Sequence, residues 1–374
     1  MRHGGEEIQV AGAGPAGLAA AITLARAGRR VVVHEARGSV GGRFNGDLQG
    51  LENWSTRQDV LAWLRALGLT TDFDHVPHRR GTVYDAWGGA HPVRASAPLF
   101  YMVERGPGPR TIDSALLAQA RALGVEVRLG SRLDRVSGPA ILATGPKAAD
   151  AIAVGYHFET DLPDGFWGIC DNRLAPGGYA YLLIMGGRGT VKTCMFRDFH
   201  RSRHYVARTV AAFERLVGLR MVNPRPHGGV GNFHIPDRAL SGRHPVAGEQ
   251  AGFQDTLWGF GMRPALWSGV WAARSLLEGR DYDRDWRRAW GGWLLGSVVN
   301  RMVYHYMGNR GMRWCLSRLD AGVDARMLLY RHYRATPLRR LLGPLARRWW
   351  RGRRDDQPCF DPECRCLWCR CGTS

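Results

Sequence analysis

Apolar positions in the first sixty residues follow a pattern typical of a strand, a helix and a second strand. A short apolar run ends at Ala11, and an Ala/Leu-rich stretch continues to Ala27-Gly28. A second apolar run begins at Val31 and ends in the acid Glu35. Short apolar runs next to glycine indicate buried strands, and the longer Ala/Leu-rich stretch indicates a helix between them. The pattern predicts the opening βαβ unit of a parallel, doubly wound sheet.

Farther along the chain the pattern becomes alternating and then helical again. Alternation over Tyr179–Ile184 and Thr190–Phe196 predicts strands, and a helical period rich in Trp and Tyr runs from Arg284 to Tyr333. We therefore predict an α/β protein with a discontinuous Rossmann-type dinucleotide-binding domain, an inserted, mostly antiparallel β substrate domain and a C-terminal helical region. The expected boundaries are 1–70, 106–150 and 240–280 for the first domain, 71–105 and 151–239 for the second, 281–333 for the helical region, 331–354 for a basic segment and 355–374 for a cysteine-rich tail.

The turn between the first strand and helix has the spacing Gly12-x-Gly14-x-x-Gly17. In this motif the first glycine makes the tight turn and the second lets the backbone approach a pyrophosphate. The third lets helix and strand pack closely, and the helix N-terminus faces the phosphates. Glu35 lies 21 residues beyond Gly14, where a carboxylate can accept hydrogen bonds from an adenosine ribose. The segment predicts a dinucleotide site.

Three later segments indicate which dinucleotide. Gly41-Gly42-Arg43 resembles the Gly-Gly-Arg element of glutathione-reductase-like flavoproteins, in which the arginine neutralises the pyrophosphate. Ala143-Thr144-Gly145 resembles the strand end that returns to the flavin, and 244–263 resembles the strand and helix start beside the ribityl chain and the flavin ring. The resemblance implies FAD rather than NAD. It assigns cofactor contacts to Gly12, Ala13, Gly14, Pro15, Ala16, Gly17, Glu35, Ala36, Gly42, Arg43, Arg110, Ala143, Thr144, Gly145, Glu249, Gly259, Gly261 and Met262.

To about residue 330 the chain resembles the geranylgeranyl reductase family of FAD-dependent flavoproteins. The most specific local likeness is 177–183, followed by the glycine turn 186–189, which in the family lines a prenyl cavity. The likeness at Arg110 is to a helix shared by flavin monooxygenases and prenyl reductases. Here Tyr181 replaces a family Trp, and Glu249 replaces the usual Asp. These departures bear on substrate identity more than on FAD binding.

The resemblance implies reduction of a C=C bond in an apolar lipid, which requires a hydride on one carbon and a proton on the other. Tyr179 and Tyr181 alternate and would face the same side of a strand, so we nominate them as substrate-lining, with one as proton donor. His234 is a second donor candidate. The external electron donor, ferredoxin or NAD(P)H, stays undecided because no second dinucleotide motif is present. A flavin monooxygenase and a membrane-docked electron carrier without its own substrate are the alternatives.

The distribution of positive charge suggests that the protein associates with a membrane. The 374 residues carry a net charge of +19, and the segment 331–354 holds nine arginines and no acid. Leucines at 338, 341, 342 and 345 recur at helical spacing before Trp349-Trp350. Arginine with Leu and Trp suits an anionic membrane surface; a solvated tail and, less favoured, nucleic acid are the alternatives. Pro337 and Pro344 are expected to break any long helix there. Without an apolar signal or spanning segment, we expect a cytoplasmic, peripherally membrane-associated protein.

Five of the eight cysteines lie within 13 positions near the C-terminus. In a cytoplasmic chain, clustered thiols indicate metal ligands before disulfides. The spacing matches neither a common zinc pattern nor a common iron–sulfur pattern, so both metals stay open beside a reducible tail without metal. The candidate ligands are Cys359, Cys364, Cys366, Cys369 and Cys371.

Overall fold

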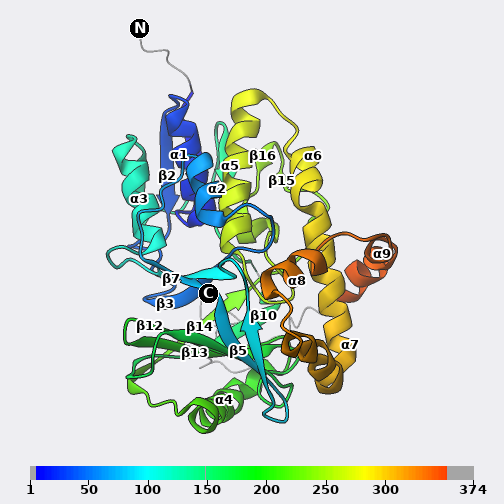
Figure 1. Ribbon diagram of the computed structural model, residues 1–374. Coiled ribbons are helices and arrows are strands. Elements are labelled where there is room, and N and C mark those ends of the chain that lie inside the picture. The colour runs from blue at the N-terminus through cyan, green and yellow to red at the C-terminus, as the bar shows by residue number, and fades with distance from the viewer. Residues whose placement is uncertain (1–5, 148, 352–374) are drawn as a thin grey trace.

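The computed structural model describes residues 6–147 and 149–351 (Figure 1). Four parallel strands form the predicted Rossmann sheet, in the order β8-β2-β1-β9. The strands are β1 (Ile8–Ala11), β2 (Val31–Glu35), β8 (Glu126–Leu129) and β9 (Ala140–Leu142). Because all pairs are parallel, the strands end at one edge of the sheet, where ligands bind in folds of this kind.

Three helices pack around this sheet. α1 (Pro15–Arg26) follows the glycine turn, and it packs against both α3 (Ile112–Ala122) and α5 (Met262–Glu278). The contact between α1 and α5 is made by backbone, since a Cβ atom at Gly269 would lie 2.0 Å from the carbonyl oxygen of Ala16. A shorter helix, α2 (Val60–Ala66), begins at Asp59, whose side chain accepts hydrogen bonds from the first-turn amides.

A second, seven-stranded sheet forms the inserted layer, in the order β14-β10-β13-β12-β11-β5-β6. Every neighbouring pair is antiparallel except β11 and β5, so the prediction of an inserted, mostly antiparallel sheet is confirmed. α4 (Ser202–Val217) covers the face turned away from the Rossmann sheet (Figure 1). The strands are β5 (Arg80–Asp85), β6 (Ala90–Arg94), β10 (Ala151–Glu159), β11 (Gly165–Cys170), β12 (Tyr179–Met185), β13 (Arg188–Met195) and β14 (Val222–Gly231).

A three-stranded antiparallel sheet lies between the two larger layers (Figure 1). Its central strand β7 (Phe100–Arg105) pairs with β3 (Asp47–Glu52) and β4 (His75–His78). β3 comes from the segment predicted for the dinucleotide domain, and β4 and β7 from the one predicted for the substrate domain. The two predicted domains are thus joined by hydrogen bonding, and their boundaries stay predictions. Two short pieces, the hairpin of β15 (Leu240–Ser241) with β16 (His244–Pro245) and a 3₁₀ turn at Gly248–Ala251, lead into α5.

The C-terminal region is helical, as predicted, and flanks both layers on one side (Figure 1). α6 (Tyr282–Trp286) and a π-helical turn (Arg287–Gly291) lead into α7 (Gly292–Asp320), which bends at Gly308, where φ is 58°. α8 (Ala325–His332) and α9 (Pro337–Arg351) follow. No helix in the described ranges is long and apolar enough to cross a membrane.

The expectation that proline breaks a long helix in the basic segment is confirmed at Pro337, since α8 ends at His332 and α9 begins at Pro337, and was wrong at Pro344. Pro337 occupies the first position of α9, where no amide hydrogen is needed, and Pro344 lies inside the helix. Packing outweighs the lost hydrogen bond: Ala346 and Trp350 are buried against α7, and the Trp350 indole donates to the Phe233 carbonyl over 2.5 Å. Tertiary contacts of this kind override local preference.

Candidate active site

A cavity of about 1160 Å³ lies where the Rossmann sheet, the two other sheets and the C-terminal helices meet. Residues of the Gly12–Gly17 turn, Glu35 and the Gly42-Arg43 loop line one end. Aromatic and aliphatic side chains line the rest, including several from α7 and α8. The cavity therefore joins the predicted dinucleotide end to a space lined mainly by apolar side chains.

The glycine turn leaves room for a phosphate group. Gly12 has a φ of 98°, and a Cβ atom there would lie 2.3 Å from the Ala143 carbonyl oxygen. A Cβ atom at Gly14 would meet nothing within 4 Å, because this position faces the cavity. Gly14 is also the N-cap of α1 and offers no side chain to its first amides. Free amides at a helix N-terminus, next to open space, form an anion site.

The acid at the end of β2 is held by the same turn. The Ala13 amide donates to Glu35 Oε2 over 2.9 Å, and the Arg37 amide donates to Oε1 over 2.9 Å. Each carboxylate oxygen retains a lone pair for a further donor. This is the arrangement that the ribose role predicted from the sequence requires.

Arg43 and Glu249, two predicted cofactor contacts, form an ion pair with each other. Arg43 Nη1 lies 3.1 Å from Glu249 Oε2, and its other terminal nitrogen donates to the Val230 carbonyl. The Asn232 amide donates to Glu249 Oε1 over 3.1 Å. The side chain of Glu, one methylene longer than that of the usual Asp, is held in this pair at the cavity wall.

The remaining predicted contacts also line the cavity. Thr144 donates to the Gln250 side-chain oxygen through its amide, over 2.7 Å, and through its hydroxyl, over 2.9 Å. Gly259 has a φ of 78°, and Gly261 is the N-cap of α5, again without a side-chain cap. A second set of free helix amides thus faces the cavity beside Met262. Two uncapped helix N-termini, at α1 and α5, suit the pyrophosphate and the polar edge of a flavin, so the described residues fit FAD.

Four nominated residues do not line this cavity. Gly17 packs inside α1, where a Cβ atom would lie 1.9 Å from the Gly12 carbonyl oxygen, and Ala36 points to solvent beside Glu35. The Arg110 backbone is left-handed, with φ of 58°, and its exposed side chain donates to Asp74 over 2.5 Å. It therefore cannot contact the cofactor in this conformation. His234 lines a separate, smaller cavity near Trp350.

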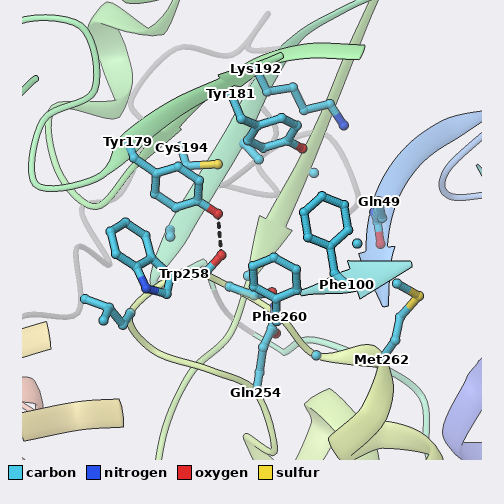
Figure 2. Close-up of a pocket in the computed structure, with 18 of the residues that line it drawn as sticks. Gln49, Phe100, Tyr179, Tyr181, Lys192, Cys194, Gln254, Trp258, Phe260 and Met262 are labelled. Atoms are coloured by element: carbon cyan, nitrogen blue, oxygen red, sulfur yellow. Dashed lines mark hydrogen bonds between the residues drawn. The ribbon is translucent and has the colours of Figure 1, made fainter. Parts of the chain in front are cut away.

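The structure brings Tyr179 and Tyr181 together on the cavity side of β12, as their alternation predicts. Their ring centroids lie 6.1 Å apart, and both point toward the aromatic rings of Phe100 and Phe260 (Figure 2). The Tyr179 hydroxyl donates to the Trp258 carbonyl, whereas no described residue forms a hydrogen bond with the Tyr181 hydroxyl. Burial raises the pKa of both hydroxyls well above the ordinary value, so both keep their protons.

A buried charge cluster beside Tyr181 was missed by the sequence reasoning. Lys192 is the cross-strand partner of Tyr181 on β13, and its ammonium donates to Asp47 Oδ1 over 2.6 Å and to His227 Nδ1 over 2.9 Å. His157 Nε2 lies 3.0 Å from the same Asp47 oxygen. Lys192 and Asp47 are each almost fully buried. The one sequence signal was a lysine within the otherwise apolar alternation of 190–196.

Contacts within the cluster determine the protonation states of Asp47 and His227. Burial would raise the pKa of Asp47, but Lys192, His157 and Gln49 outweigh burial and hold it well below the usual range. Burial, together with the Lys192 ammonium, lowers the pKa of His227 to about 4. His227 is therefore neutral near pH 7 and donates through Nε2 to the Arg43 carbonyl, 3.3 Å away. Ligand atoms of Asp47, His157 and His227 lie within 4.8 Å of one another, but the Lys192 ammonium already supplies the cation there.

The five cysteines nominated as metal ligands, Cys359, Cys364, Cys366, Cys369 and Cys371, lie outside the described residues. Of the other three, Cys194 faces the cavity on β13, and burial raises its pKa to about 12. It is therefore a neutral thiol and not a nucleophile at neutral pH.

Comparison with known proteins bears on the cofactor and the fold. Residues 15–55, which span α1, β2, the Gly42-Arg43 loop and β3, match the family model of flavin-containing amine oxidoreductases. No curated protein matches the chain in sequence. The family match supports FAD as the cofactor.

Solved structures share the architecture at low sequence identity. A geranylgeranyl bacteriochlorophyll reductase-like protein from Thermoplasma acidophilum superposes with a TM-score of 0.69 at 15% identity, covering 91% of this chain and 98% of that one. A flavin-dependent brominase reaches a TM-score of 0.61 at 16% identity, with 87% and 98% covered. A p-nitrophenol 4-monooxygenase from Pseudomonas putida reaches 0.54 at 16% identity, with 84% and 98% covered. The chain has the fold of FAD-dependent oxidoreductases and carries a flavin-oxidoreductase sequence motif in its nucleotide-binding segment.

Proposed function

We propose that this flavoprotein is a reductase that saturates C=C bonds of a prenyl lipid or another long apolar lipid. The cavity carries the proposal. It begins at the FAD-binding glycines and continues between Phe100, Phe166 and Phe260 toward Leu316 and Leu328 of α7 and α8. Apolar lining beyond the nucleotide-binding end supports a substrate site, which an electron carrier does not require. The likeness to the Thermoplasma reductase-like structure supports the same substrate class.

FAD, once reduced, would supply a hydride to one carbon of the alkene. The protein holds the alkene among apolar side chains and excludes water, so that the reactive groups meet in a fixed geometry. The second carbon receives a proton from the Tyr181 hydroxyl, which faces the cavity. Burial and the nearby Asp47 carboxylate disfavour the phenolate that results, so the Tyr181 hydroxyl regains its proton from solvent before the next turnover. One hydride and one proton then account for the two hydrogens added.

The electrons come from an external donor. No second dinucleotide motif is present in the sequence, so either ferredoxin or NAD(P)H reduces the flavin by a transient encounter. We place the reaction at the cytoplasmic face of a membrane, where long apolar lipids reside. Separate assays with reduced ferredoxin and with NADPH under nitrogen, scored by bleaching of the flavin absorbance, decide between the donors.

Mass spectrometry of reaction products tests the proposal. Chemically reduced protein is incubated with prenyl lipids in detergent, and the expected products are heavier by two hydrogens for each saturated bond. The brominase and the monooxygenase share this fold, so oxygen insertion is the competing outcome. Products that carry oxygen, with no saturated lipid, would replace the reductase with a monooxygenase. Unchanged lipid with every donor would favour the electron carrier.

A further inference from the structure

Exposed apolar side chains gather on the C-terminal helices. Among the described residues, eleven large apolar side chains are exposed, and seven of them lie between Val303 and Leu345. The rest of the described surface carries only four, from four separate segments. Exposed apolar side chains that gather on neighbouring helices such as α7 and α9 indicate a docking surface.

α9 has two apolar stripes, and only one of them is used inside the protein. Leu342, Ala346 and Trp350 pack against α7 and its neighbours. Leu338, Leu341 and Leu345 form the other stripe and are 64%, 77% and 59% exposed. Their i, i+3 and i+7 spacing places them on one face of the helix. This outer stripe has no partner among the described residues.

The positive charge around the outer stripe indicates which kind of partner it binds. α9 contains five arginines and no acidic residue, and Arg340 and Arg348 are exposed beside the leucines. Arginines flanking an apolar stripe suit a bilayer with anionic headgroups, where the leucines enter the acyl boundary. A nucleic acid would engage the arginines but leave the leucines in water, so its binding would not depend on them.

The same helical region forms part of the cavity wall. Val303 and Trp314 of α7 line the cavity and are also 40% and 60% exposed to solvent. The cavity therefore reaches the surface on α7, against which α9 packs (Figure 1). We propose that the outer stripe of α9 and the exposed side chains of α7 dock the protein on an anionic bilayer, with the cavity open toward the lipid. The passage of a lipid into the cavity rests on the proposed function, whereas the docking itself does not.

Sedimentation of the full chain with vesicles tests the docking surface. The wild-type protein is expected to sediment with phosphatidylglycerol-containing vesicles. With phosphatidylcholine vesicles it should remain in the supernatant. The double variant Arg340→Gln/Arg348→Gln should weaken binding roughly 25-fold, at about fivefold for each charge near an anionic surface. The control pair Arg29→Gln/Arg121→Gln removes the same charge from exposed positions elsewhere and should change binding less than twofold.

Variants of the three leucines distinguish binding to a bilayer from binding to another polyanion. Leu338→Ser/Leu341→Ser/Leu345→Ser should abolish vesicle binding, while Leu123→Ser, at an exposed leucine after α3, should leave it unchanged. Retained binding in the triple variant, equal binding to both vesicle types, or tighter binding to duplex DNA than to anionic vesicles would each overturn the proposal. Circular dichroism confirms that each variant is folded. Because no substrate or turnover is involved, these results are independent of the reductase assay.

Discussion

The absence of a side chain at Gly14 keeps the phosphate end of the cavity open. The backbone there has φ of −76°, which any residue can adopt, and a Cβ atom would meet no neighbour within 4 Å. Gly14→Val should therefore fold normally but place its methyl groups where a pyrophosphate must approach. We expect the purified variant to lose the yellow flavin absorbance that wild type retains until heat or acid releases it.

Gly38→Val is the matched control for that experiment. Gly38 has the same open surroundings and ordinary backbone, but it does not line the cavity. It should bind FAD as wild type does. Full flavin content in Gly14→Val, measured against protein concentration, would show that the cofactor does not use this turn.

Tyr181 and Tyr179 should differ in their effects on the reaction. Tyr181→Phe removes the hydroxyl proposed to donate the proton, and general acid catalysis is worth about 100-fold or more. The kcat should fall by that factor with flavin content unchanged. Tyr179→Phe removes a hydrogen bond to the Trp258 carbonyl, so it should lower stability by about 1 kcal/mol and the rate less than tenfold. Equal rate losses in the two variants would contradict the assignment of the proton to Tyr181.

His227 makes stability depend on pH in one direction. Its pKa is about 4 in the folded protein and near 6.5 when unfolded, so between these values only the unfolded chain gains a proton there. The stabilisation is complete above pH 6.5 and is lost as the pH falls toward 4. From pH 7.5 to 5.5, wild type should lose about 1 kcal/mol more than His227→Gln, which keeps both hydrogen-bonding roles without titrating. Parallel urea denaturation profiles for the two proteins would show that His227 is not neutralised by its surroundings.

At the scale of elements, the contact of α1 with α5 depends on a missing side chain. Gly269→Ala would bring a Cβ atom to 2.0 Å from the Ala16 carbonyl oxygen and force the helices apart. We expect a loss of about 2 kcal/mol in the free energy of unfolding, measured by urea denaturation, and weaker FAD binding because α1 carries the glycine turn.

Gly291→Ala is the same substitution without the clash. Gly291 has helical φ and ψ of −57° and −38°, and the nearest atom to its Cβ position is 3.8 Å away. Alanine should stabilise the helix there by up to about 1 kcal/mol. If both substitutions change the unfolding free energy in the same direction, backbone packing of α1 on α5 is not what Gly269 provides.

Some helices and strands could be predicted from the sequence, and others could not. The βαβ unit and strands β12 and β13 were predictable because their periodicity and glycine turns are local signals. α9 was not, since only packing on α7 reveals why a helix continues through Pro344. Arg110 was misassigned because a motif likeness says nothing about its left-handed backbone, which turns the side chain toward Asp74.

At the scale of the whole molecule, the fold class followed from four motifs in order, but the charge cluster did not. Asp47, His157, Lys192 and His227 come from four strands of two sheets, and no spacing in the sequence brings them together. Only the register that pairs Tyr181 with Lys192, and the stacking of the sheets, creates the site. The apolar lining of the cavity is likewise a property of the assembled layers.

In the proposed reaction, electrons pass from the flavin to a lipid alkene in this cavity. The most direct test mixes fully reduced protein with a prenyl lipid in the strict absence of oxygen and follows the flavin absorbance. We expect the oxidised flavin spectrum to return in step with formation of lipid that is two hydrogens heavier, and to return much more slowly in Tyr181→Phe. A flavin that stays reduced with lipid and reoxidises only when air is admitted would show that no alkene accepts its electrons.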